Sequence, residues 1–261
     1  MSRKAKMKHL KKICRVLLIA AFWICVWALL SIAFGNELLF PSPLLVLQTL
    51  FRLVQTPEFY ITTLNSLLNI LKGLAIAVSS ACITAVITSK IPLLRALILP
   101  LMSVIKATPV ASFIMLAWIF IGASDVPVFI AELIVFPVIW TNLDEGLSKV
   151  DPQLSEVARV YGFSPMKRLR LLILPTTKPY FISACRTSLG LSWKAGIAAE
   201  ILTMPPSTIG TEIATAKLYI MTPEMFAWTL TVILLSLAME FGLMAILKRA
   251  DTPQKGGIEN A

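Results

Sequence analysis

Long apolar runs separated by short polar segments are the dominant pattern of this 261-residue sequence. A helix of about 20 consecutive apolar residues crosses the hydrocarbon core of a bilayer. Six runs reach that length, at residues 14–34, 63–88, 95–121, 126–144, 179–203 and 224–247. The pattern therefore predicts an all-α integral membrane protein with about six transmembrane helices.

The composition supports this class of protein. Hydrophobic residues make up 57% of the chain and charged residues 15%, whereas a soluble domain carries about 25% charged residues. The net charge of +10 could suggest nucleic-acid binding. The basic residues flank apolar runs instead, as in membrane proteins. We therefore expect a lipid bilayer as partner and no nucleic acid.

The positions of Lys and Arg predict the orientation in the membrane. With the N-terminus inside, 18 of the 24 basic residues lie in cytoplasmic segments and two lie in outside loops. Basic residues favour the cytoplasmic side, so both termini are predicted to be inside. Residues 1–13 are then a basic cytoplasmic tail. A cleaved signal peptide is the alternative at this end, but the run at 14–34 is long enough to span and predicts a retained first helix.

The polar segments divide the rest of the chain. The outside segment 35–62 contains three prolines and predicts irregular structure or a short surface helix. Residues 60–247 form the predicted core of five helices, interrupted by the long cytoplasmic segment 145–178. Residues 250–261 have the composition of a disordered tail.

The cytoplasmic segment carries two helix-start signals. Asp151-Pro152 and Ser164-Pro165 each pair a capping side chain with a proline in the first turn. The pattern predicts two short helices with a sharp bend at Gly162, the second running to Leu174 and closed by Pro175. Such a pair could dock on a partner protein or lie as an amphipathic hairpin on the lipid surface.

The same segment resembles the EAA motif of binding-protein-dependent ABC transporter permeases. The family pattern is E-A-A-x3-G-x9-I-x-L-P, and this chain has Glu156-Val157-Ala158, Gly162 and Leu172-Ile173-Leu174-Pro175 at the same spacing. In that family the segment is the coupling helix that docks on the ATPase. The resemblance implies ATPase-coupling roles for the residues Glu156, Ala158, Tyr161, Gly162 and Pro175.

Three further stretches look like the nitrate/sulfonate/taurine-type subfamily. They are Ser66-Leu67 with Lys72-Gly73, Lys106 to Pro109, and Ser192-Trp193 to Glu200. Asn69, where arginine is common, and residues 204–210 depart from the family pattern. The resemblance implies a type I importer permease fold. It also implies cytoplasmic ABC ATPase subunits, a second permease subunit (a homodimer) and an extracytoplasmic substrate-binding protein as partners, in the cell membrane of a prokaryote.

Enzyme chemistry has little support in the sequence. The chain has no P-loop motif, so ATP hydrolysis would reside in a partner subunit. The one histidine, His9, lies in the basic tail, and the four cysteines are widely spaced. We therefore expect no metal site, no cofactor and no intramembrane enzyme.

Charged residues inside the predicted spans mark a candidate solute pathway. Charges there usually face a cavity or one another. Leaving out the two residues at each end of a span, seven occur, Lys72, Lys106, Glu132, Arg186, Lys194, Glu200 and Glu240. The pathway candidates are Lys106, Pro109, Trp193 and Glu200, with snorkelling or helix packing as the alternative for each. Four basic against three acidic residues favours an anionic solute over a cationic one.

These observations predict the membrane-spanning permease of an ATP-binding-cassette importer for a small anionic or heterocyclic solute. A self-contained secondary transporter or channel is the main alternative, and would work without an ATPase. The transmembrane component of a vitamin-type importer is another alternative, which also uses cytoplasmic coupling helices.

Overall fold

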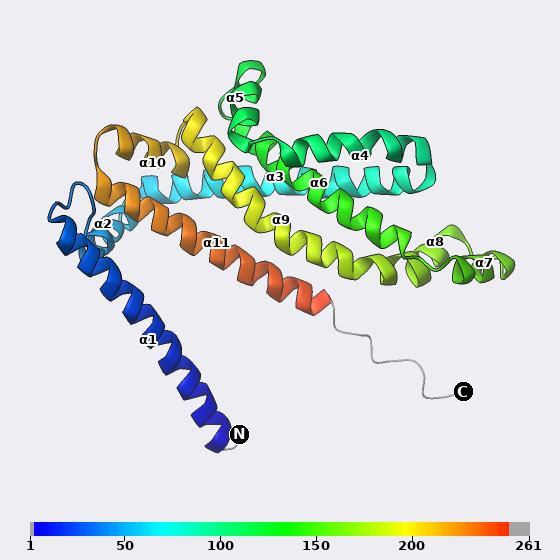
Figure 1. Cartoon of the computed structure of the whole chain (residues 1–261), viewed down its shortest axis with the longest axis horizontal. Coiled ribbons are helices and arrows are strands. Elements are labelled where there is room, and N and C mark those ends of the chain that lie inside the picture. The colour runs from blue at the N-terminus through cyan, green and yellow to red at the C-terminus, as the bar shows by residue number, and fades with distance from the viewer. Residues whose placement is uncertain (1–2, 251–261) are drawn as a thin grey trace. The chain divides into compact units, whose positions relative to one another are not determined.

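A computed structural model describes residues 3–250, which form helices joined by short connections and contain no strand. The predicted all-α class is confirmed for this part of the chain. Residues 251–261 of the predicted disordered tail lie outside the described residues. The elements are α1 (Arg3–Phe34), α2 (Pro43–Val54), α3 (Pro57–Lys90), α4 (Pro92–Ala107), α5 (Val110–Phe120), α6 (Val126–Ser148), α7 (Pro152–Val160), α8 (Pro165–Arg168), a π-turn (Leu169–Ile173), α9 (Leu174–Thr203), α10 (Ile209–Leu218) and α11 (Thr222–Ala250) (Figure 1).

Four of the described helices are long and apolar enough to cross a membrane, namely α1, α3, α6 and α11. The bent pair α4 and α5 adds a fifth if it counts as one crossing. Helix α9 has 30 residues, long enough to span, but it includes Lys178, Arg186, Lys194 and Glu200. The predicted number of six crossings therefore stays a prediction.

The predicted span 95–121 is not one continuous helix. It is broken between α4 and α5, whose axes differ by 106°. Pro109 causes the break, because the residue before a proline is disfavoured in the helical region. Thr108 accordingly adopts an extended conformation with φ −81° and ψ 134°. The continuous helix expected from hydrophobicity alone was wrong at this point, whereas a single crossing by the bent pair stays a prediction.

Residues 61–211 and 233–250 belong to one compact unit, in which α6 packs along α9. Small side chains on α3 allow close approach to α6, as is usual between membrane helices. A Cβ added at Gly73 would lie 2.7 Å from the Cβ of Ala131. The buried cluster at this contact comprises Ala77, Ala81 and Ala85 of α3 with Val135, Ile139 and Trp140 of α6.

Residues 3–60 and 212–232 belong to a second compact unit. The segment predicted to lie outside contains the short helix that the sequence allowed, α2. It is capped by Ser42, whose side chain accepts a hydrogen bond from the Leu45 N–H at 3.3 Å. Phe59 stacks on Trp228 with ring centres 5.1 Å apart. Arg52 of α2 pairs with Glu224 of α11 at 2.7 Å. Aromatic and ionic contacts thus hold this unit together.

Candidate functional site

Helix α7 begins with the predicted cap. The Asp151 side chain accepts a hydrogen bond from the Gln153 N–H at 2.7 Å, and Pro152 occupies the first turn. The cap satisfies one backbone N–H that has no acceptor within the helix. The helix pair, predicted to be cytoplasmic, therefore starts where the sequence predicted it.

Gly162 ends α7 in the left-handed conformation, with φ +61°. The Phe163 N–H donates to the Ala158 carbonyl at 2.9 Å, and the Gly162 N–H donates to the Arg159 carbonyl at 3.1 Å. These two bonds form a Schellman motif, in which glycine is favoured because it has no side chain to oppose a positive φ. The predicted bend at Gly162 is confirmed.

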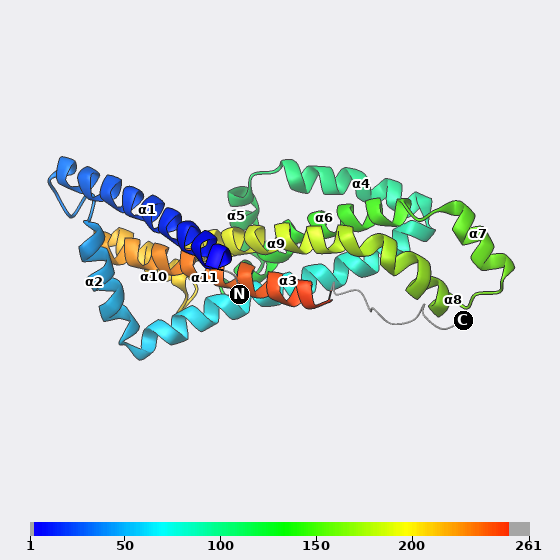
Figure 2. The same cartoon turned by 90° about the horizontal axis from the view of Figure 1, so that it is seen from below.

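The sequence predicted that the second helix of the pair ends at Pro175. The structure differs, because the chain continues through Pro175 in helical form. After α8, a π-turn spans Leu169–Ile173 and leads into α9, which places Pro175 in the first turn of α9. In the π-turn the Leu174 N–H donates to the Leu169 carbonyl. The wider turn tolerates proline, which lacks an N–H and would otherwise disturb a regular helix. Figure 2 shows the chain leaving α6, turning through α7 and returning by α8 to α9.

The helix pair exposes apolar side chains. Val160 is 77% and Tyr161 75% exposed, whereas Ala158 is only 2% exposed. Glu156 lies at the surface and pairs with Arg159 at 3.1 Å. The apolar side chains of Val160 and Tyr161 are therefore open to contact from outside this chain. We call α7, the bend and α8 (residues 151–168) the loop surface.

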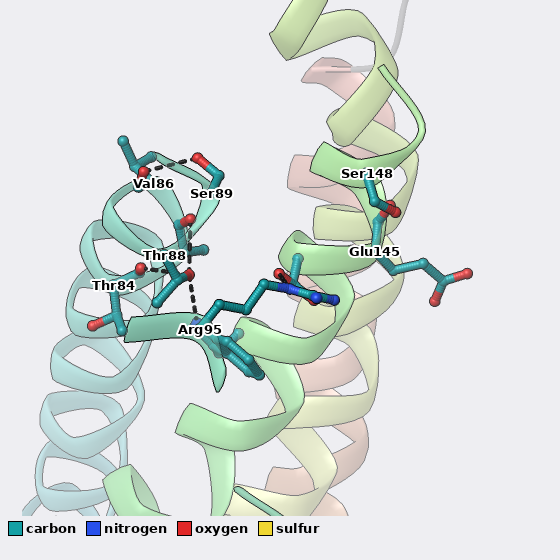
Figure 3. Close-up of polar contacts among 10 residues, drawn as sticks. Thr84, Val86, Thr88, Ser89, Arg95, Glu145 and Ser148 are labelled. Atoms are coloured by element: carbon teal, nitrogen blue, oxygen red, sulfur yellow. Dashed lines mark hydrogen bonds and ion pairs between the residues drawn. The ribbon is translucent and has the colours of Figure 1, made fainter. Parts of the chain in front are cut away.

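An ion pair joins the base of this loop to α4. Arg95 donates two hydrogen bonds to the Asp144 carboxylate, both at 2.8 Å. Figure 3 shows Arg95 reaching toward α6, on which Glu145 and Ser148 lie close to the start of the loop. Two parallel hydrogen bonds make this geometry more specific than a single contact. The sequence did not reveal the pair, because the two residues are 49 positions apart.

The pathway candidates do not share one environment. Lys106 and Pro109 are exposed near the break between α4 and α5, and the Lys106 ammonium donates to the Thr141 hydroxyl at 2.8 Å. Trp193 is 2% and Glu200 0% exposed, so the protein covers both. The structure therefore does not bring all four candidates together in one site. It also does not bring them to the loop surface.

Glu200 instead organises a buried polar cluster. Its Oε2 accepts from the Ser66 hydroxyl at 2.8 Å and from the Gly210 N–H at 3.0 Å. The Ser66 hydroxyl oxygen in turn accepts from the Ile209 N–H at 2.8 Å. A Cβ at Gly210 would lie 2.6 Å from the Ile201 nitrogen, so only glycine fits against α9 here. Two of the three family-like stretches named from the sequence, those of Ser66 and Glu200, meet in this cluster, together with residues 209–210 of the segment that departs from the family pattern.

A polar cavity of about 270 Å³ lies in the same unit. Its lining includes Asn65, Asn69, Lys72, Asp125 and Thr208. Sequence reasoning did not predict Asp125 here, because the residue belongs to a short connection with no motif. Among residues 3–250 no group of three or more His, Cys, Asp or Glu side chains is placed to hold a metal ion.

Comparison with known proteins agrees with this architecture. Residues 73–251 match the model of the family described as binding-protein-dependent transport system inner membrane component. A probable ABC transporter permease protein of Brucella melitensis is 28% identical over 224 residues, which cover 85% of this chain and 90% of that protein. The taurine transport system permease protein of Escherichia coli is 24% identical over 240 residues, covering 89% and 86%.

A solved structure shares the fold. The crystal structure of an amino acid ABC transporter with histidines contains a chain with a TM-score of 0.57 and 16% identity, covering 75% of this chain and 93% of that one. The resemblance predicted from the EAA-like segment and the three further stretches is confirmed, as is a multi-pass location in the plasma membrane. This chain belongs to the family of inner membrane components of binding-protein-dependent transport systems.

Proposed function

We propose that this chain is the permease of an importer in which two copies form the membrane channel and two cytoplasmic ATPases supply the energy. A substrate-binding protein outside the membrane delivers the solute. The observation that carries the proposal is the loop surface, where a precise helix bend presents exposed apolar side chains on a chain that has no P-loop.

The loop surface has the properties of a docking element. The Schellman turn fixes Tyr161 and Gly162 at the tip, and 75% of the Tyr161 side chain is exposed. Large aromatic side chains contribute strongly to protein interfaces when a partner buries them. Glu156 and Ala158 position the turn. Glu156 forms an ion pair with Arg159 at the surface, and the Ala158 carbonyl accepts the hydrogen bond from the Phe163 N–H. Pro175 lies further along, where α9 begins, and could pass loop movement into that helix.

The Arg95–Asp144 pair gives the loop a second route into the membrane domain. Asp144 lies seven residues before Asp151 on α6, and Arg95 lies on α4. Movement of the loop would pull on α4 through this pair, and α4 ends at the 106° break before α5. A rigid helix that ends at a sharp bend is suited to switch between two arrangements.

The orientation and the solute class follow from charge. With both termini in the cytoplasm, the loop surface faces the ATPases, as the distribution of Lys and Arg favours. The Escherichia coli relative is named as a taurine transport permease. For this chain we propose a small anionic or heterocyclic solute, supported by the excess of basic residues in the predicted spans.

Copurification tests the proposal. The tagged chain is expressed with each candidate ATPase of its own genome, and the ATPase retained through detergent extraction is measured. We expect Gly162→Pro and Glu156→Lys to release the ATPase, since proline cannot adopt the positive φ and lysine reverses the surface charge. Lys149→Ala, a nearby exposed change outside the helix pair, is the matched control and retains the ATPase.

The alternative, a secondary transporter or channel, predicts a different outcome. Uptake would then depend on an ion gradient, and no ATPase would copurify with the wild-type chain. Equal ATPase retention by Gly162→Pro, Glu156→Lys and Lys149→Ala would refute the coupling roles of the loop residues. The family assignment would remain in either case.

A further inference from the structure

Burial sorts the charges of the predicted spans by sign. The four basic residues Lys72, Lys106, Arg186 and Lys194 are all exposed. Of the acidic residues, Glu200 is fully buried, Glu132 is half-buried and Glu240 is exposed. The exposed charged side chains of the predicted spans are therefore mostly basic, although the sequence places nearly equal numbers of basic and acidic residues in these spans.

Two of the exposed basic residues lie on a helix that is otherwise well covered. Between residues 183 and 201 of α9, the exposed side chains are Ser183, Arg186, Thr187 and Lys194. Gly190 is half-buried and lies on the same face, four residues from Arg186 and from Lys194. We call Ser183, Arg186, Thr187, Gly190 and Lys194 the polar stripe. None of its exposed members is a large apolar side chain, and the half-buried Leu191 flanks it.

A polar stripe of this length does not suit contact with lipid. A lysine or arginine at the centre of a membrane helix costs about 2.5–3.5 kcal/mol when it faces hydrocarbon. Neither Arg186 nor Lys194 forms an ion pair with any acidic group among the residues that the structure describes. Water or an anion must therefore solvate these two groups, because hydrocarbon cannot.

The two basic residues of the polar stripe lie one after the other along the axis of α9. Arg186 and Lys194 are eight residues apart, which is about 12 Å along a helix axis. Basic side chains placed in succession attract an anion and let it pass from one to the next, as in anion-selective pores. Thr187 and Ser183 add hydroxyl donors to the same face.

We propose that the polar stripe of α9 lines the aqueous path of the importer and that Arg186 and Lys194 bind a small anionic solute in transit. This inference rests on the proposed function and narrows its solute class from anionic or heterocyclic to anionic. It differs from the pathway candidates Trp193 and Glu200, which lie on the covered side of the same helix.

Charged thiol reagents test the proposal without knowledge of the solute. The free cysteines Cys14, Cys25, Cys82 and Cys185 are first replaced by serine. Thr187→Cys is then introduced into the full chain, coexpressed with its ATPase, in membranes opened to reagent on both sides. The reagents are two methanethiosulfonates of similar size, one bearing a sulfonate and one bearing a trimethylammonium group.

We expect Thr187→Cys to react with both reagents and about tenfold faster with the sulfonate, relative to a free thiol in solution, because of the neighbouring positive charge. Arg186→Gln with Lys194→Gln abolishes this preference, whereas Arg186→Lys keeps it. If the double variant fails to fold, Lys194→Gln alone lowers the preference. Ile24→Cys on α1 reacts with neither reagent, and Ser148→Cys on the loop side shows that both reagents are active.

Two outcomes overturn the proposal. A Thr187→Cys thiol that resists both reagents, like that of Ile24→Cys, would mean that lipid or another protein surface covers the stripe. Equal rates for both reagents, unchanged by Arg186→Gln with Lys194→Gln, would mean that these residues do not select anions. The readout uses neither ATP nor the loop surface, so its failure leaves the ATPase copurification result untouched.

Discussion

Helices α1 and α9 expose opposite chemistry, although both were predicted as membrane spans. Between residues 17 and 34 of α1 the exposed side chains are apolar, and only 6% of this segment is buried in the protein. In the middle of α9 the exposed side chains are polar and the opposite face is buried, including Ser192, Trp193 and Gly196. Length and hydrophobicity identify a helix as a membrane candidate, but the chemistry of its exposed face indicates whether lipid or water surrounds it.

The largest expected effect comes from placing a lysine on the exposed face of each helix and comparing the two costs. Ile24→Lys places a charge on the apolar surface of α1, where Ile24 is 55% exposed. We expect a cost to insertion of about 3 kcal/mol, as for lysine at a helix centre. Thr187→Lys on the polar stripe of α9 should cost almost nothing. An insertion assay with glycosylation sites on both sides of each helix measures the two values.

Equal costs for the two lysine variants would remove the distinction between the helices. A high cost at both positions would mean that the polar stripe contacts lipid. A low cost at both would mean that α1 does not lie in hydrocarbon at Ile24.

The contrast between α1 and α9 marks the limit of what the sequence could predict. The apolar runs predicted the helices, and local capping signals predicted the bend at Gly162, because both depend on neighbouring residues. The Arg95–Asp144 pair and the contacts of Ser66 in the Glu200 cluster join residues 49 to 143 positions apart, so no local pattern reveals them. The sequence identified the charged residues of the predicted spans, but only the structure shows that Glu200 is buried while Lys194 is exposed.

Packing gives the next largest difference between the two helices. A Cβ at Gly196 of α9 would lie 2.6 Å from Cγ1 of Ile70, so Gly196→Leu forces the neighbouring helices apart. Overpacking of this kind costs about 1–3 kcal/mol. Ala21→Leu on the exposed surface of α1 should leave stability unchanged. Thermal unfolding of the two variants in the same detergent measures the difference.

A loss of stability for Ala21→Leu as large as for Gly196→Leu would show that another part of the protein covers α1. Unchanged stability for Gly196→Leu would show that α3 and α9 are looser than their side-chain contacts indicate. Either result would weaken the view that α9 is packed along one whole face, whereas α1 is exposed along most of its length.

The C-terminal part of α9 is held by a buried carboxyl group. Glu200→Ala would leave the Gly210 N–H and the Ser66 hydroxyl without their shared acceptor. Leaving buried donors unpaired costs about 1–3 kcal/mol. We expect a clear fall in the melting temperature of the detergent-solubilised protein. Glu200→Gln, which keeps one acceptor oxygen, should restore part of the stability, and a full loss with both variants would mean that the negative charge itself is required.

The C-terminal part of α1 should show the smallest effect. The Ser31 hydroxyl donates to the Phe40 carbonyl at 3.1 Å, and the Trp27 indole donates to the Pro41 carbonyl at 3.1 Å. Ser31→Ala removes one of these two neutral hydrogen bonds, which contributes about 1 kcal/mol or less. The melting temperature should therefore fall less than with Glu200→Ala, measured under the same conditions. A larger fall would mean that the turn after α1 depends on Ser31 as strongly as the Glu200 cluster depends on its carboxylate, and the two helix ends would then differ in chemistry but not in strength.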